Sequence, residues 1–298
     1  MIYVISPKTT YAAKRLASEA RIKSYELRIM DIAELLACNF KLTPLLGDVL
    51  YIRNPYSGSR PDYLEKIIQL AKSFKAQGGR VVDDNITKGN LGKGKWEDYQ
   101  KLMKAGLPIP KTWKYESRIM NYGFKLSTKH LALSPFILKW IYGLKAKGTF
   151  LIRKAADLEN LPRYLPRNEL MQQEYIEADW EYKIITVGYK ALPVILRFKF
   201  NKKSGRVDFS SARRVPIYRP FGLPMNRHAT NLAQLAELAA KTLGRELAKV
   251  DILEKAGKFY VLEVNRFPGL KSFEQQTKSN IYAKFIEYLA ALAHYGTA

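Results

Sequence analysis

Three side chains that carry oxygen donors lie close together near the end of the sequence. Asp251 is part of one apolar run, and Glu263 and Asn265 are part of a second. The polar segment 254–258, which includes Gly257, separates the two runs, and this pattern predicts a β-hairpin. With the glycine near the turn, Asp251 pairs with Glu263. Asn265 then shares the face of Glu263, because side chains alternate along a strand.

An oxygen-only ligand set of this kind indicates a particular chemistry. Carboxylate and amide oxygens without His or Cys suit a hard cation such as Mg²⁺, which proteins usually bind together with substrate phosphates. The same residues are also compatible with an exposed hairpin edge that carries ordinary polar side chains. The trio alone does not decide between these two interpretations, so groups that bind phosphate must be sought elsewhere in the chain.

A lysine on a predicted strand supplies one such group. Lys139 lies in the apolar run 136–140, and the loop after it carries Gly143 and Gly148 before a returning strand at 150–152. Backbone amides of a glycine-flanked loop can surround phosphate oxygens, and a lysine adds a positive charge. A lysine before a turn is more often only a surface residue, so this loop is a weak signal alone. Together with the oxygen trio, it predicts phosphates held between two elements.

The elements that must position these groups follow two different patterns. The first 85 residues or so alternate between short apolar strands and helices, which predicts a small doubly wound domain around a parallel sheet. No GxGxxG sequence follows its first strand, so we expect no dinucleotide site there. The later part of the chain reads as antiparallel strands with helices laid on them, an α+β pattern. Its strands are expected at 136–140, 150–152, 171–176, 182–187 and 191–200, and its helices at 95–105, 226–242 and 281–293.

Composition limits the class of protein. The formal net charge is +23 and the isoelectric point is about 9.8, which predicts an anionic partner such as nucleotide phosphates, an acidic protein or RNA. The lysine-dense stretch 88–147 is also compatible with a merely solvated face. No run is long and apolar enough for a membrane span, and residues 1–5 read as a strand rather than a signal peptide. Cys38 is the single cysteine, which favours a reducing cytoplasm.

In order and spacing, these segments resemble the ATP-grasp superfamily, and within it the RimK-like group of ribosomal-protein glutamate ligases. The matching segments are Lys95 with Gly106-Leu107-Pro108-Ile109-Pro110, 136–139, 173–176, 181–183 with Val187-Gly188, Arg197, 250–253, 263–265, 268–270 and Phe273-Glu274. The resemblance covers about residues 80–290. It implies an ATP-grasp fold: a Rossmann-like domain at 1–85, a central subdomain with the phosphate loop at 86–172, and a C-terminal subdomain with the magnesium site at 173–298.

The resemblance also implies roles for individual residues. Asp251, Glu263 and Asn265 would bind one or two Mg²⁺ ions, for which Mn²⁺ can substitute. Lys183 and Arg197 would act near the phosphates and the activated carboxylate. The implied ATP-binding residues are Lys95, Lys139, Gly143, Gly148, Glu174, Tyr175, Glu181, Ser210 and Ser211. Among them, Glu174 and Tyr175 would meet the adenine edge at the hinge between two sheets.

Two segments depart from the family pattern. The phosphate loop carries Lys145 and Lys147, whereas this loop in the family is commonly rich in glycine and serine. Residues 208–212 read Asp-Phe-Ser-Ser-Ala, where the family usually has Asp-Phe-Arg-Ser-Asn, and Arg213 and Arg214 follow at once. The resemblance therefore leaves open which residue near this segment holds the γ-phosphate or the acceptor.

The activity implied by the resemblance is an ADP-forming carboxylate–amine ligase that works through an acyl phosphate. We expect it to add an amino acid, for example glutamate, to an acidic protein, peptide or small-molecule acceptor, and related ligases imply a homo-oligomer. The alternative is a nucleic-acid- or ribosome-binding protein on an ATP-grasp scaffold, favoured by the aromatic residues interleaved with lysine at 113–122 and 140–142. The intact oxygen trio favours the ligase, because a pure binder has no use for it.

Overall fold

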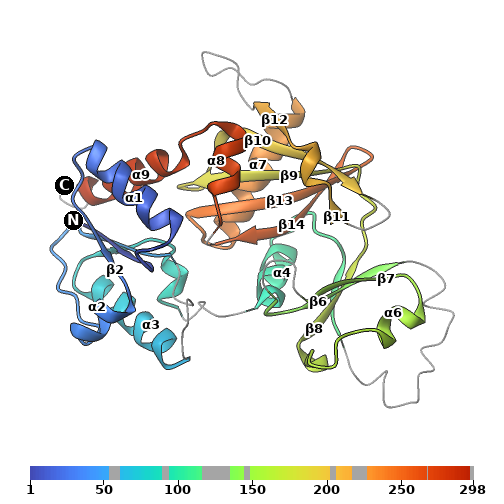
Figure 1. Ribbon diagram of the computed structural model, residues 1–298, viewed down its shortest axis with the longest axis horizontal. Coiled ribbons are helices and arrows are strands. Elements are labelled where there is room, and N and C mark those ends of the chain that lie inside the picture. The colour runs from blue at the N-terminus through green and yellow to red at the C-terminus, as the bar shows by residue number, and fades with distance from the viewer. Residues whose placement is uncertain are drawn as a thin grey trace.

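The computed structural model describes residues 1–53, 61–88, 94–115, 135–143, 148–201, 206–216, 227–266 and 268–295. Residues 144–147 of the predicted phosphate loop and residues 116–122 of the aromatic and lysine-rich segment lie outside these ranges. Within them, the strands form three sheets, of four, four and six strands, which are separate in Figure 1. No helix in the described ranges has the length and apolar character needed to cross a membrane.

The N-terminal sheet is parallel and has the strand order β2-β1-β3-β4. Asp31 caps the second helix and forms a capping box with Glu34. Alternation of short strands with helices thus gives the expected doubly wound layer. The elements are β1 (Ile2–Ile5), α1 (Tyr11–Ile22), β2 (Leu27–Met30), α2 (Ile32–Ala37), β3 (Val49–Ile52), α3 (Pro61–Ala76) and β4 (Arg80–Val81).

A second, antiparallel sheet of four strands has the order β5-β8-β6-β7. Helix α4 (Lys95–Lys104) precedes it in the chain and lies between it and the largest sheet (Figure 1). The remaining elements of this part are β5 (Thr112–Lys114), β6 (Phe136–Trp140), β7 (Thr149–Ile152), α6 (Ala155–Glu159) and β8 (Leu170–Glu174).

The largest sheet is antiparallel and has the order β11-β10-β9-β13-β14, with β12 paired to β10. Helix α7 packs on one face through an alanine-rich side, and part of the other face packs in a core cluster with α8 and α9. The elements are β9 (Trp180–Val187), β10 (Lys190–Asn201), β11 (Arg206–Val207), β12 (Arg213–Pro216), α7 (Arg227–Thr242), β13 (Leu247–Lys255), β14 (Lys258–Asn265), α8 (Lys271–Thr277) and α9 (Ile281–Tyr295).

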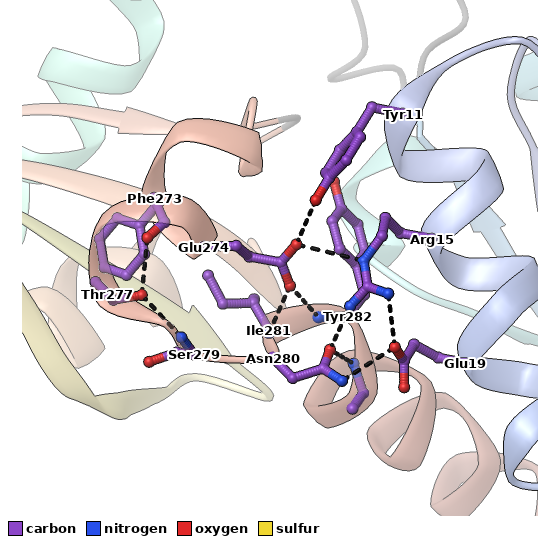
Figure 2. A network of polar contacts seen from close by, with 11 residues as sticks. Tyr11, Arg15, Glu19, Phe273, Glu274, Thr277, Ser279, Asn280, Ile281 and Tyr282 are labelled. Atoms are coloured by element: carbon purple, nitrogen blue, oxygen red, sulfur yellow. Dashed lines mark hydrogen bonds and ion pairs between the residues drawn. The ribbon is translucent and has the colours of Figure 1, made fainter.

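The last helix joins the largest sheet to the first one. Phe285 of α9 lies in one core cluster with residues of α1, β1, β3 and the largest sheet, and its ring centroid is 4.8 Å from that of Tyr51. Beside this cluster, Figure 2 shows the buried carboxylate of Glu274, which accepts hydrogen bonds from Tyr11 Oη at 3.0 Å and from the backbone N of Ile281 at 2.9 Å. The first and last parts of the chain are thus packed together by apolar and polar contacts.

Candidate active site

The hairpin that carries the oxygen trio has the predicted register. Asp251 of β13 pairs with Glu263 of β14, and the side chains of such a pair lie on the same face. Asn265 Nδ2 lies 3.4 Å from Asp251 Oδ2, so the third residue of the trio reaches the same place. An irregularity in the ladder follows Asp251, where Ile252 pairs with Val261 instead of Leu262. The three side chains therefore converge as the sequence predicted.

Two lysines surround the carboxylate of Asp251. Lys183 Nζ on β9 lies 3.6 Å from Asp251 Oδ1, and Lys249 Nζ on β13 lies 3.7 Å from Oδ2. Lys183 also forms a close ion pair with Glu181, two residues earlier on the same face of β9. Burial lowers the pKa of Lys183, but Asp251 and Glu181 outweigh it and hold this pKa above its usual value. Lys183 is therefore charged at neutral pH.

Helix α4 brings a third lysine from the opposite side. Lys95, the first residue of the helix, donates a hydrogen bond to Gly143 O, and its Nζ lies 3.8 Å from Glu263 Oε1. Burial lowers the pKa of Lys95, while Glu263 acts to raise it. The contact between Lys95 and Glu263 thus links α4 to the hairpin that carries the oxygen trio.

The second predicted phosphate-binding lysine is more deeply buried than the first. Lys139 on β6 is only 8% exposed, and its Nζ lies 3.3 Å from Tyr99 Oη of α4. Tyr99 in turn donates to the backbone oxygen of Leu262 on β14. Burial lowers the pKa of Lys139 to about 8, although nearby carboxylates, Glu263 first among them, act to raise it. A chain of contacts thus runs from the second sheet through α4 to the hairpin.

The residues expected near adenine lie where the second sheet passes into the largest one. Glu174 ends β8, and its backbone N donates to Lys111 O at 2.8 Å. Tyr175 follows, with its ring centroid 6.4 Å from that of Phe200 on β10. The next residues, at 176–178, pack against the largest sheet. The structure therefore places Glu174 and Tyr175 at a joint between two sheets, as expected.

The structure does not bring Arg197 to this cluster. Leu196 pairs with Lys183, whereas Arg197 pairs with Tyr182, so Arg197 and Lys183 point to opposite faces of the sheet. The guanidinium of Arg197 lies 4.3 Å from the ring centroid of Trp180, on the face that packs against α7. The expectation that Arg197 stands near the phosphates is corrected by this placement, and the cause is the alternation of side chains along β10.

Two further sets of expected ATP contacts have local structural roles. Gly148 has a φ of +82°, and a Cβ there would lie 2.8 Å from Trp140 Cβ, so the β6–β7 hairpin itself requires glycine. The hydroxyls of Ser210 and Ser211 donate to Asp208 in a short turn, at 2.5 Å to Oδ1 and 2.6 Å to the backbone oxygen. These hydroxyls would have to leave Asp208 before they could donate to ATP.

The oxygen trio fits a hard divalent cation. Asp251 is 6% exposed, and among the described residues its buried Oδ1 has no hydrogen-bond partner and only the ammonium of Lys183 at 3.6 Å, so this oxygen can still accept a closer cation. The described residues contain no group of three or more His, Cys, Asp or Glu side chains that could hold a metal. Two carboxylates and one carboxamide instead leave several coordination positions for phosphate oxygens and water, as Mg²⁺ prefers.

Three residues of the cluster escaped the sequence analysis. Tyr99 lies four residues after Lys95, so the two share a face of α4, and this helical spacing was the available signal. Lys249 lies two residues before Asp251 on the same face of β13. Arg245, which binds Asp98 of α4 at 2.7 and 2.8 Å, gave no local signal, because the two are far apart in the sequence.

Comparisons with known proteins point to one family. A family model described as a RimK-like ATP-grasp domain matches residues 92–289. A protein of Haemophilus influenzae (strain PittEE) named "Probable alpha-L-glutamate ligase" is 24% identical over 299 residues, which cover 94% of each chain. A protein of the same name from Legionella pneumophila (strain Corby) is 25% identical over 302 residues, with 94% and 91% covered.

Solved structures share the fold. The ATP-grasp ligase PsnB, complexed with minimal precursor, Mg and ADP, superposes with a TM-score of 0.68 at 17% identity, covering 98% of this chain and 97% of the other. D-alanine–D-alanine ligase from Bacillus anthracis gives a TM-score of 0.63 at 16% identity, with 99% and 97% covered. The family match spans more than half of the sequence, and the facing lysines and oxygen ligands lie within it. The chain therefore belongs to the RimK-like ATP-grasp family and is an ADP-forming ligase.

Proposed function

We propose that this ligase joins an amino acid, with glutamate as the first candidate, to a carboxylate of an acidic protein, peptide or small molecule. A carboxylate oxygen of one substrate attacks the γ-phosphorus of ATP, and ADP leaves. The amine of the second substrate then attacks the acyl carbon of the resulting acyl phosphate, phosphate leaves, and the nitrogen loses a proton as the amide forms. The relatives named as glutamate ligases support the choice of amino acid.

One observation carries this proposal. The ion pair between Lys95 and Glu263 joins cationic groups on α4 and β6 to the carboxylates on β13 and β14. Phosphoryl transfer depends on cations that neutralise the phosphates and on groups that hold them in line with the attacking oxygen. A cluster of lysines that faces carboxylates meets both needs once ATP is present. The phosphates can then bind the lysines, and the carboxylates can bind a cation.

The proposed roles follow the positions of the side chains. Lys95 and Lys139 bind the phosphates, and Lys183 binds the γ-phosphate or the acyl phosphate from the other side. Asp251, Glu263 and Asn265 would hold one or two Mg²⁺ ions, whose bound charge would lower the repulsion between the phosphates and an attacking carboxylate. Glu181 would contact the ribose of ATP, and Glu174 and Tyr175 would contact the adenine.

The high positive charge supports an acidic acceptor. With a net charge of +23, the chain attracts anions over distances set by ionic strength, and an acidic peptide or carrier gains both affinity and encounter rate from such a field. The same charge, with Trp113 half-exposed on the edge strand β5 beside Lys114, supports contact with RNA or a ribosome as the second candidate.

The test is a measurement of ADP formation with ATP, Mg²⁺ and single amino acids, with and without acidic peptides, followed by mass spectrometry of the products. The proposal expects ADP only when both substrates are present, and a peptide mass increased by one amino-acid residue. Salt-sensitive RNA binding without substrate-dependent ADP formation would instead support the second candidate.

A further inference from the structure

The first sheet has one strand edge that pairs with no other strand in the described part of the chain. In the order β2-β1-β3-β4, β2 is paired only with β1. Ser6 N donates to Met30 O, so the backbone groups of Met30, and by alternation those of Arg28, are directed to β1. The backbone N–H and C=O groups of Leu27 and Ile29 therefore point to the open edge. This edge can accept a further strand.

A groove of about 540 Å³ runs beside this edge, between β2 and α1. Leu27 and Ile29 form part of its floor, because they pack on the core cluster that includes α1 but stay only partly buried. Ala13, Ala17 and Ala20 line the α1 side, and their short side chains leave the groove open. The other side of α1 packs against α9, and the two helices lie next to each other in Figure 1.

Cations without a carboxylate partner surround the groove. Lys14, Ala17 and Arg21 are spaced three and four residues apart, so they share one stripe of α1 along the rim. Arg28 projects from β2 to the opposite face of the sheet. Lys14, Arg21 and Arg28 are exposed, and none of them forms an ion pair within the ranges that the structure describes. Lys8, at one end of the groove, already has a carboxylate oxygen 2.9 Å from its Nζ.

An extended polypeptide fits this combination of groups. The open edge offers backbone donors and acceptors at the spacing of a strand, and another polypeptide backbone supplies partners for both. The phosphates of a nucleic acid accept hydrogen bonds but donate none, so they would leave the carbonyl oxygens of Leu27 and Ile29 unpaired. A second copy of this chain would bring the same cations together, with a net charge of +23 on each copy. The charges instead fit an acidic peptide.

The spacing of the cations indicates the pattern of that peptide. Lys14 and Arg21 are two helical turns apart, which is about 10.5 Å along the axis of α1. Positions i and i+4 of an added strand are about 13 Å apart, so carboxylates there can reach both cations. Position i+2 then places an apolar side chain over Ala17. Positions i+1 and i+3 project to the face of Arg28, where acidic side chains are favoured again.

We propose that this groove binds an extended acidic peptide segment with one central apolar residue, which joins β2 as a fifth strand of the first sheet. None of the candidate active-site residues lines the groove. Binding there therefore requires neither ATP nor Mg²⁺, and it can be tested apart from the proposed ligase reaction.

The experiment titrates the whole protein into a labelled peptide, Gly-Gly-Glu-Glu-Val-Glu-Glu-Gly-Gly, and measures fluorescence anisotropy. A peptide of the same composition, with valine placed before all the glutamates, controls for charge. We expect the valine-centred peptide to bind about tenfold more tightly, because only this peptide places valine over the groove with carboxylates on both sides. Hydrogen exchange in segment 26–30, measured by mass spectrometry, should slow when it binds, since the N–H groups of Leu27 and Ile29 gain acceptors.

Two variants change the groove, and two matched variants make the same changes elsewhere. Ala17→Phe fills the groove and Lys14→Glu repels the peptide, so each should weaken its binding about tenfold or more. Ala76→Phe and Lys72→Glu alter exposed positions of α3, which packs on the other face of the first sheet. These two controls should bind the peptide as the unsubstituted protein does.

Equal binding of the two peptides, or equal losses in Lys14→Glu and Lys72→Glu, would show that net charge alone attracts the peptide and would overturn the site. Full affinity in Ala17→Phe, or unchanged exchange in segment 26–30, would overturn it as well. A dimer that Ala17→Phe dissociates in analytical ultracentrifugation would assign the edge to a second copy of the chain. Single-stranded RNA that binds more tightly than the peptide, and that Ala17→Phe releases, would assign the groove to nucleic acid.

Discussion

Lys95 Nζ on α4 lies 3.8 Å from Glu263 Oε1 on β14, and this ion pair connects α4 to the largest sheet. The side chains are 21% and 37% exposed, so the pair contributes only about 0–1 kcal/mol to folding. Because the pair is weak, Lys95 and Glu263 can each exchange the other for a more strongly bound ligand. Triphosphate can replace Glu263 beside Lys95, and Glu263 can then bind a cation that the same triphosphate shares.

Removing a carboxylate of the oxygen trio should stop catalysis without unfolding the protein. We predict that Asp251→Asn and Glu263→Gln each reduce kcat for ADP formation by at least a hundredfold. The physical reason is the loss of about 3 kcal/mol of electrostatic stabilisation where charge is transferred. The measurement is coupled-assay kinetics at saturating ATP and Mg²⁺, with circular dichroism to check the fold.

The control is Glu254→Gln on the same hairpin. Glu254 faces away from the trio and accepts a hydrogen bond from Tyr182 Oη at 2.6 Å. This variant should retain kcat within a few fold, even if its melting temperature falls. Full activity in Asp251→Asn and Glu263→Gln would show that these carboxylates hold no catalytic cation.

Lys139 should make ATP binding depend on pH. Burial holds its pKa near 8 in the free protein, so the side chain is charged below that pH and neutral above it. ATP binds the charged form, and its affinity should therefore fall by up to tenfold per unit as pH rises from 8 to 9.5. Equilibrium titration with a fluorescent ATP analogue measures this slope.

The matched variant for this titration is Lys139→Met, which keeps the length of the side chain and removes its charge. It should bind ATP weakly at all these pH values, with no slope above pH 8. Since it no longer buries an ammonium group, its free energy of unfolding at pH 7 should rise by about 1–3 kcal/mol. A slope above pH 8 that persists in Lys139→Met would assign the titration to another group.

A pair of buried carboxylates, Asp83 and Glu246, should set the stability of the joint between the first and largest sheets. Asp83 and Glu246 each accept a hydrogen bond from the backbone N of the other. Burial raises the pKa of Asp83 to about 7, while Arg266 acts to lower it. The folded state therefore binds more protons than the unfolded state between about pH 4 and 7, and this contribution to stability is lost as pH rises through 7.

Asp83→Asn isolates this effect, because asparagine keeps the acceptor for Glu246 N and tolerates the left-handed backbone at φ +59°. The variant should gain about 2 kcal/mol relative to the unsubstituted protein between pH 5 and pH 8. Urea denaturation at both pH values measures the two free energies of unfolding. Equal pH dependence in the two proteins would mean that Asp83 does not titrate in this window.

The network in Figure 2 should contribute strongly to the packing of α9. Glu274 accepts hydrogen bonds from the backbone N of Ile281 and from Tyr11 Oη, so its removal leaves a helix start and a tyrosine hydroxyl without their acceptor, while Arg15 keeps its ion pair with Glu19. We predict that Glu274→Ala lowers the free energy of unfolding by about 1–3 kcal/mol. The exposed pair of Glu287 with Lys23 provides the control, since Glu287→Ala should cost at most about 1 kcal/mol.

The sequence predicted the hairpin well because its information is local. Alternation of side chains and a turn containing Gly257 are enough to pair Asp251 with Glu263. The N-terminal sheet was predicted for a similar reason. A helix comes after each of its first three short strands, and the helix start has a clear signal, such as Pro61 for α3. In both cases the signal lies within a few tens of residues.

The wrong placement of Arg197 and the missed contacts have one cause. They depend on contacts between elements, which the local sequence pattern does not contain. The face that Arg197 occupies is set by how β10 pairs with β9, and an irregularity in that pairing lies between Ala191 and Ile195. The role of Tyr99 depends on where α4 docks, and the pairing of Asp83 with Glu246 joins residues 163 positions apart. These relationships are decided by packing between elements.

The central claim is that the facing lysines and carboxylates transfer the γ-phosphate of ATP to a substrate carboxylate. Its most direct test uses an acceptor peptide whose carboxylate oxygens carry ¹⁸O, with mass analysis of the phosphate released. We predict that one ¹⁸O atom appears in phosphate for each amide formed, because the acyl phosphate passes an acceptor oxygen to phosphorus. Amide formation that releases only unlabelled phosphate would contradict the account.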